Sequence, residues 1–68
     1  MSTLQLKRQS CGMSQSQLAD KADVSVRTLQ NYEQGRKPIE KAAAETVLRI
    51  ARALGCTVEE LLEGRDDN

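Results

Sequence analysis

Start and stop signals for short helices recur along the whole chain. All four glycines fall where an apolar helical pattern ends: Gly12, Gly35, Gly55 and Gly64. Glycine readily takes the left-handed conformation that ends a helix. Capping-box spacing, in which Ser or Thr precedes Gln or Glu by three positions, marks three starts: Ser2 with Gln5, Ser14 with Gln17, and Thr57 with Glu60. Ser25 offers a simpler cap, so the signals favour helices throughout.

The predicted helices span about 3–11, 15–22, 26–33, 41–54 and 58–63. The fourth range carries one apolar stripe with a period near 3.6: Ala44, Val47, Leu48, Ala51 and Leu54. The same period turns other residues inward: Leu4, Cys11, Leu18, Ala22, Leu29, Tyr32, Val58, Leu61 and Leu62. Met13, Val24 and Ile39 are expected to fill the connections. The fourth helix is therefore predicted to be the central core helix.

The length and composition fit one small all-α domain. A chain of 68 residues has room for a single core. Its only aromatic residue is Tyr32, so the core must consist of aliphatic and sulfur-containing side chains, which suit packed helices better than a sheet. We expect the domain to cover residues 1–64, with a frayed carboxyl-terminal tail at 65–68.

Several classes of function are disfavoured by what the sequence lacks. The chain has no His and only two cysteines, Cys11 and Cys56, which are far apart, so no zinc site, other metal site or cofactor is expected. Both thiols are predicted to act as small buried hydrophobes. The sequence has no glycine-rich phosphate loop and no base beside a thiol, so we do not expect an enzyme. Without a long apolar run or a signal-peptide pattern, a cytoplasmic location and no membrane contact are expected.

Charge is distributed unevenly although the net charge is zero. Residues 1–41 hold seven basic and four acidic side chains, a balance of +3, whereas residues 42–68 hold three basic and six acidic ones, a balance of −3. A polyanion would therefore be attracted to one part of the molecule and repelled by the other.

The segment 14–35 places two helical patterns around a three-residue turn, which is the layout of a helix-turn-helix DNA reader. With Leu29 and Tyr32 turned inward, the second helix presents four outward residues as candidate base readers: Val26, Arg27, Gln30 and Asn31. Arg suits guanine O6 and N7, Gln or Asn suits adenine N6 and N7, and Val suits a thymine methyl group. A polar outer face is also found on ordinary solvated helices, but this one carries the residue types that pair with bases.

Six residues around these helices are predicted to contact the DNA backbone: Ser14, Gln15, Ser25, Gln34, Arg36 and Lys37. Ser25 begins the reading helix, where free N–H groups and the helix dipole favour a phosphate. Arg36 and Lys37 follow the reading helix, and an ordinary solvated loop is the alternative interpretation for this basic pair.

Three stretches in order carry a resemblance to a known family: GMSQSQLADKADVS, VRTLQNYEQGRKP and LRIARALGCTVEELL. From Leu4 to Leu62 the chain resembles the helix-turn-helix domain of phage lambda and Cro-type repressors, the XRE family. The resemblance implies a compact five-helix lambda-repressor-like domain that binds a double-stranded operator, usually a palindromic one, as a homodimer. It implies a transcriptional regulator, most often a repressor. Asp23 stands where many relatives have Gly in the turn, and the connection after Gly35 is longer than in the short phage repressors.

The resemblance also implies individual roles. It implies that Gln15 is a clamp at the DNA backbone and that the four outward residues of the second helix of this segment are base readers. It also implies that Arg8 forms an internal ion pair with Glu33. The pair agrees with the residue pattern, because Arg8 lies between Leu4 and Cys11 and would need an acid if partly buried. An exposed Arg8 without a partner is the alternative.

A protein-binding role competes with DNA reading. Small domains of this type can also serve as antitoxins or adaptors, and the acidic last helix with Leu61 and Leu62 offers a surface for a partner protein. Salt dependence separates the two, because binding to DNA weakens steeply as salt rises.

Overall fold

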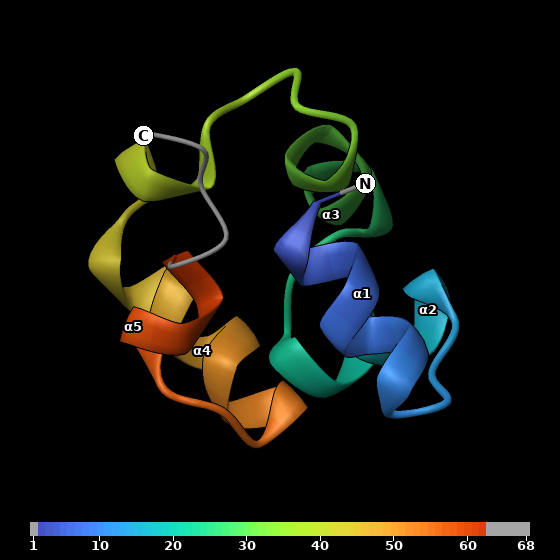
Figure 1. Cartoon of the computed structure of the whole chain (residues 1–68). Coiled ribbons are helices and arrows are strands. Elements are labelled where there is room, and N and C mark those ends of the chain that lie inside the picture. Colours follow the sequence, from blue (N-terminus) through green and yellow to red (C-terminus); the bar gives the residue numbers. More distant parts are fainter. Residues whose placement is uncertain (1, 63–68) are drawn as a thin grey trace.

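The computed structural model describes residues 2–62 as a bundle of short helices (Figure 1). The elements are α1 (Thr3–Ser10), α2 (Gln15–Ala22), α3 (Val26–Glu33), the 3-10 turn η1 (Ile39–Lys41), α4 (Ala44–Leu54) and α5 (Val58–Leu62). Five α-helices and no strands occur within these residues, which confirms the all-α prediction. Position 63, Gly64 and the predicted tail at 65–68 lie outside the described residues.

Side-chain caps fix where the helices begin. Ser14 and Gln17 form a complete capping box, in which the Ser14 hydroxyl accepts from the Gln17 N–H at 3.1 Å and the Gln17 side chain accepts from the Ser14 N–H at 2.8 Å. Thr57 and Glu60 form the same reciprocal pair before α5. At α1 the Ser2 hydroxyl accepts from the Gln5 N–H at 3.0 Å. These caps satisfy amides that the first turn of a helix leaves unpaired.

The core lies where α2, α3 and α4 meet. Leu18, Leu29 and Ile50, one from each helix, are fully buried. Leu4 from α1 and Leu61 from α5 close the core at its edges. The predicted fillers of the connections, Met13, Val24 and Ile39, are partly buried and pack against this core, as expected.

The prediction of which α4 residues form the buried apolar face is wrong at one edge of that face. The helix begins at Ala44, not near 41, because residues 39–41 form η1. Ala44 is exposed and Leu48 is 39% exposed, whereas Ile50 is completely buried. The reason is that α4 packs most extensively against α2. This contact rotates the buried face toward Ile50 and Ala53 and leaves Leu48 at the margin.

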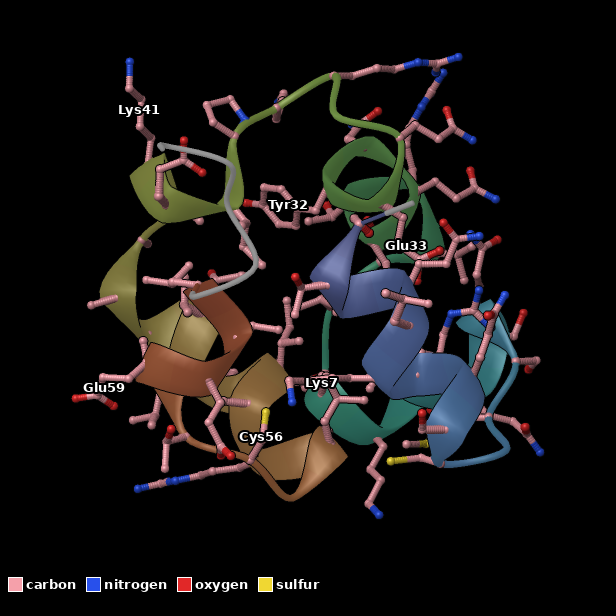
Figure 2. The ribbon with its side chains drawn as sticks, viewed as in Figure 1. Lys7, Tyr32, Glu33, Lys41, Cys56 and Glu59 are labelled. Atoms are coloured by element: carbon pink, nitrogen blue, oxygen red, sulfur yellow. The ribbon has the colours of Figure 1, made fainter. Side chains whose placement is uncertain are left out.

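The prediction that both cysteines are buried is wrong for Cys11, whereas Cys56 is partly buried and packs against the core. Cys11 is exposed, because it is the C-cap of α1 and lies beyond the packed face of that helix. Its thiol donates to the Leu54 carbonyl oxygen at 3.5 Å. Cys56 is half-buried, and burial raises the pKa of its thiol while the nearby Lys7 ammonium opposes the rise. Figure 2 shows the Lys7 side chain extending toward Cys56.

Asp23 takes the position in the turn after α2 that usually belongs to glycine. Its φ is 59° and its ψ is 46°, which is the left-handed conformation, and Asp23 is the one non-glycine residue with a positive φ among residues 2–62. The Asp23 N–H donates to the Asp20 carbonyl at 3.2 Å, and the Val24 N–H donates to the Ala19 carbonyl at 3.0 Å. The chain thus reverses into α3 at a backbone geometry that costs an L residue more than glycine.

We expect Asp23→Gly to raise the free energy of unfolding by about 1 kcal/mol, because glycine adopts the left-handed conformation without steric strain. Thermal and urea unfolding followed by circular dichroism would measure the gain. Asp23→Ala is the matched control and should lower stability, since alanine lacks the polar side chain that eases this conformation. Equal stability of the Gly and Ala variants would contradict the strain at this turn.

Candidate nucleic-acid interface

Helices α2 and α3 form a helix-turn-helix unit held by apolar contacts. Leu18 and Ala22 of α2 and Leu29 of α3 are buried, and Val24 in the turn packs against the same core. Ser25 begins α3, with its hydroxyl accepting from the Thr28 N–H at 3.0 Å. The position and the start of α3 are therefore set by the core and by a local cap.

The outward side of α3 carries the predicted base readers with unequal exposure. Arg27 is exposed, Gln30 and Asn31 are half-exposed, and Val26 is half-buried against the core. Leu29 is buried on the side that faces the core, and Glu33 is buried next to Gln30, three positions further along the helix. Arg27 is consequently the most accessible of the four, and Val26 offers only part of its side chain.

The end of α3 draws the following loop back over its last turn. Gly35 has a φ of 76°, and this turn directs the N–H groups of Arg36 and Lys37 to the Asn31 carbonyl oxygen at 2.9 and 3.3 Å. Gln34, Arg36 and Lys37 are all exposed. The loop then arches across to η1, where Lys41 points away from α3 (Figures 1 and 2). The backbone at Arg36 and Lys37 thus stays beside the last turn of α3.

The two serines predicted at the DNA backbone are exposed N-caps with different remaining capacity. The Ser14 hydroxyl accepts from the Gln17 N–H, which leaves its own hydrogen for another acceptor. The Ser25 hydroxyl accepts from the Thr28 N–H and also donates to Thr28 Oγ1 at 2.8 Å. At the start of α3, the backbone N–H groups are therefore more available for a further hydrogen bond than the Ser25 side chain is.

A buried ion pair joins α1 to α3. Arg8 Nε lies 2.7 Å from Glu33 Oε2, and a second guanidinium nitrogen of Arg8 donates to Glu33 Oε1 at 3.2 Å. A third nitrogen donates to the Met13 carbonyl oxygen at 2.8 Å. The side chains are 11% and 2% exposed, and Figure 2 shows Glu33 between α3 and α1. Bidentate pairing of this kind compensates a buried carboxylate.

Two glutamines continue the hydrogen bonds of the Arg8–Glu33 ion pair toward the surface. Gln15 Nε2 donates to Glu33 Oε1 at 2.9 Å, and Gln15 Oε1 accepts from Gln30 Nε2 at 3.3 Å. Residue types and spacing alone do not predict these contacts, although Gln30 and Glu33 share one side of α3 at a spacing of three. The structure thus brings together four residues of the predicted site: Arg8 of α1, Gln15 of α2, and Gln30 and Glu33 of α3.

Three exposed basic side chains, Arg27, Arg36 and Lys37, lie on α3 or directly after it. Within residues 2–62, none of Arg27, Arg36 and Lys37 forms a salt bridge with an acid. Arg49 on α4, in contrast, pairs with Glu45 at 2.7 Å. Figure 2 shows Glu59 of α5 on the side of the molecule away from α3. An anionic backbone would therefore be attracted to the α3 side.

Two packed helices joined by a tight turn, with exposed Arg and amide side chains on the second, define the helix-turn-helix class of DNA-binding proteins. The family model described as helix-turn-helix (HTH_3) matches residues 4–61. The chain belongs to this family, the lambda-repressor-like or XRE family of DNA-binding regulators. Comparisons with curated proteins and with solved structures gave no significant match.

The longest helix within residues 2–62 has 11 residues. No helix in this part of the chain is long and apolar enough to span a membrane.

We expect Arg8→Met to lower the free energy of unfolding by about 3–5 kcal/mol, because it leaves the buried Glu33 carboxylate without a counter-ion. Urea unfolding measures this loss. The double variant Arg8→Met/Glu33→Leu should recover most of it, since neither charge then remains buried. A double variant as unstable as the single one would mean that packing, not charge compensation, causes the loss.

Proposed function

We propose that this protein is a transcriptional repressor that recognises a specific double-stranded DNA sequence by placing α3 in the major groove. The observation that carries the proposal is the composition of the accessible side of α3. Arg27 is exposed there without a salt-bridge partner in the described chain, next to the half-exposed amides of Gln30 and Asn31. These groups match the hydrogen-bonding edges of bases in the major groove.

In this proposal the four readers have distinct roles. Arg27 donates two hydrogen bonds to guanine O6 and N7, and Gln30 and Asn31 pair with adenine. Val26 touches a thymine methyl group with the part of its side chain that the core leaves accessible.

The backbone contacts flank the readers on both sides. Ser14 and Gln15 at the start of α2, and Ser25 at the start of α3, approach one stretch of phosphates. Gln34, Arg36 and Lys37 follow α3 and approach another, since the Asn31 carbonyl holds this loop beside the helix. These contacts set the register without selecting a sequence.

We further propose a homodimer on a palindromic operator, because one reading helix covers only a few base pairs. An apolar hollow on the α4–α5 side supports this assembly. Its lining residues are Glu40, Ala42, Ala44, Val47, Leu48, Val58 and Leu62. Leu48 is 39% exposed at this hollow, and a second copy would cover it.

Selection of bound sequences from random duplex DNA tests the DNA-reading proposal. We expect a palindromic consensus whose half-sites contain a guanine read by Arg27. Arg27→Ala should weaken binding to the consensus by about 1–3 kcal/mol and relax the preference at that base pair alone. Equal weakening for every sequence would make Arg27 a phosphate contact. Failure to select any sequence, with tight binding of a partner protein instead, would favour the adaptor role.

The dimer is tested by Leu48→Lys, which places a charge in the apolar hollow. We expect the dissociation constant of the dimer to rise at least about tenfold, because burial of a leucine contributes about 1.5–3 kcal/mol. Analytical ultracentrifugation measures the change. Leu6→Lys is the matched control, since Leu6 on α1 is 49% exposed and does not line the hollow. Equal effects of the two variants would contradict an interface at α4 and α5.

A further inference from the structure

A shallow hollow lies between the carboxyl end of α2 and the outer side of α4. Two small buried residues, Ala22 and Ala53, form its apolar floor. The other side chains that line it are charged: Lys21, Asp23, Arg49 and Arg52. Three of these four are basic, and they belong to two different helices. The hollow is therefore a concave surface on which basic side chains converge.

Arg49 is only partly compensated by acids of the chain. One of its terminal nitrogens donates to Glu45 Oε2 at 2.7 Å, one helical turn earlier in α4. The other terminal nitrogen lies 3.9 Å from Asp23 Oδ2, which is too far for a hydrogen bond. The Asp23 side chain is 90% exposed, so water screens this second contact. The nitrogen of Arg49 that faces Asp23 is therefore available to a stronger acceptor.

The two other basic side chains of the hollow have no acid partner within residues 2–62. Lys21 and Arg52 are both exposed and form no salt bridge there. Arg52 follows Arg49 by three positions, so the two guanidinium groups project from adjacent turns of α4. Guanidinium and ammonium groups are the donors that proteins use for phosphate oxygens.

The balance of charge at the hollow suits an anion with two negative charges. Glu45 compensates one of the three basic side chains. When Asp23 turns into solvent, where most of its side chain already lies, two positive charges remain unmatched. A phosphate group carries about −1.5 to −2 charges at pH 7 and offers three acceptor oxygens. A single carboxylate would leave one of the positive charges without a partner.

We propose that this hollow binds a phosphate group through Lys21, Arg49 and Arg52, and that the Asp23 carboxylate competes with the phosphate for Arg49. None of these residues is among the predicted base readers or backbone contacts, so the inference does not depend on DNA reading by α3. The phosphate belongs either to a nucleic-acid backbone or to a small phosphate compound, and the experiment separates these two sources.

Titration with inorganic phosphate, followed by the amide NMR shifts of the protein at constant pH and ionic strength, tests the site. Sodium chloride replaces phosphate in a reference titration, which measures the effect of screening alone. We expect phosphate-specific shifts at residues 21–23 and 49–53. Lys21→Gln/Arg52→Gln should raise the phosphate dissociation constant about tenfold, because each exposed charge pair contributes up to about fivefold.

The competing role of Asp23 has a test of its own. Asp23→Asn should lower the phosphate dissociation constant by about threefold, because asparagine also tolerates the left-handed turn but carries no charge. An Asp23→Asn variant that binds phosphate no more tightly than the wild-type protein would overturn this competition.

Arg36→Gln/Lys37→Gln is the matched control for the loss of charge. It removes two exposed positive charges that likewise form no salt bridge within residues 2–62, from a loop outside the hollow. The phosphate dissociation constant of this variant should stay within about twofold of the wild-type value, since salt screens distant charges. Circular dichroism melting establishes that each variant is folded at the temperature of the titration.

Equal weakening by the two double variants would overturn the site, because phosphate affinity would then follow net charge alone. Shifts that sodium chloride reproduces would overturn it as well. Binding to a DNA duplex of arbitrary sequence, measured at several salt concentrations, identifies the source of the phosphate. A smaller salt dependence of Lys21→Gln/Arg52→Gln than of the wild-type protein assigns the phosphate to DNA. An unchanged salt dependence, with weaker binding of inorganic phosphate, supports a site for a small phosphate compound.

Discussion

The buried pairing of Arg8 with Glu33 is the interaction on which the arrangement of the first three helices depends. It joins the amino-terminal helix to the last turn of α3 and ties the loop at Met13 to both. A small domain has few apolar contacts with which to orient its helices. One compensated charge pair supplies directional contacts that apolar packing does not, and its hydrogen bonds continue through Gln15 to Gln30 of α3.

The starts of α2, α3 and α5 and the end of α2 were predictable from sequence because they depend on local chemistry. Ser14, Ser25 and Thr57 cap their own helices through contacts within three residues, and Asp23 ends α2 in the left-handed conformation as a glycine would. Such contacts are local, so residue order is sufficient to indicate them. The pairing of Arg8 with Glu33, 25 residues apart, was accessible only through the family resemblance and the inward position of Arg8.

The predicted buried face of α4 was wrong because a neighbouring helix decides which face is buried. The apolar pattern of α4 allows two adjacent buried faces, and contact with α2 selects the one that contains Ile50 rather than Leu48. Cys11 fits the period of α1 but follows its last helical residue, so the packed face ends before it. The hydrogen bonds of Gln15 were equally inaccessible, since they require α2 and α3 to be placed first.

The position of the single aromatic residue has a practical consequence. Tyr32 lies in α3 directly between Asn31 and Glu33, packs against the core and points toward the space beneath the loop that leads to η1 (Figure 2). The chain contains no Trp and no Phe. Every intrinsic fluorescence signal of the protein therefore originates in α3. Tyr32 is therefore an optical reporter built into α3, and no label has to be attached to follow this helix.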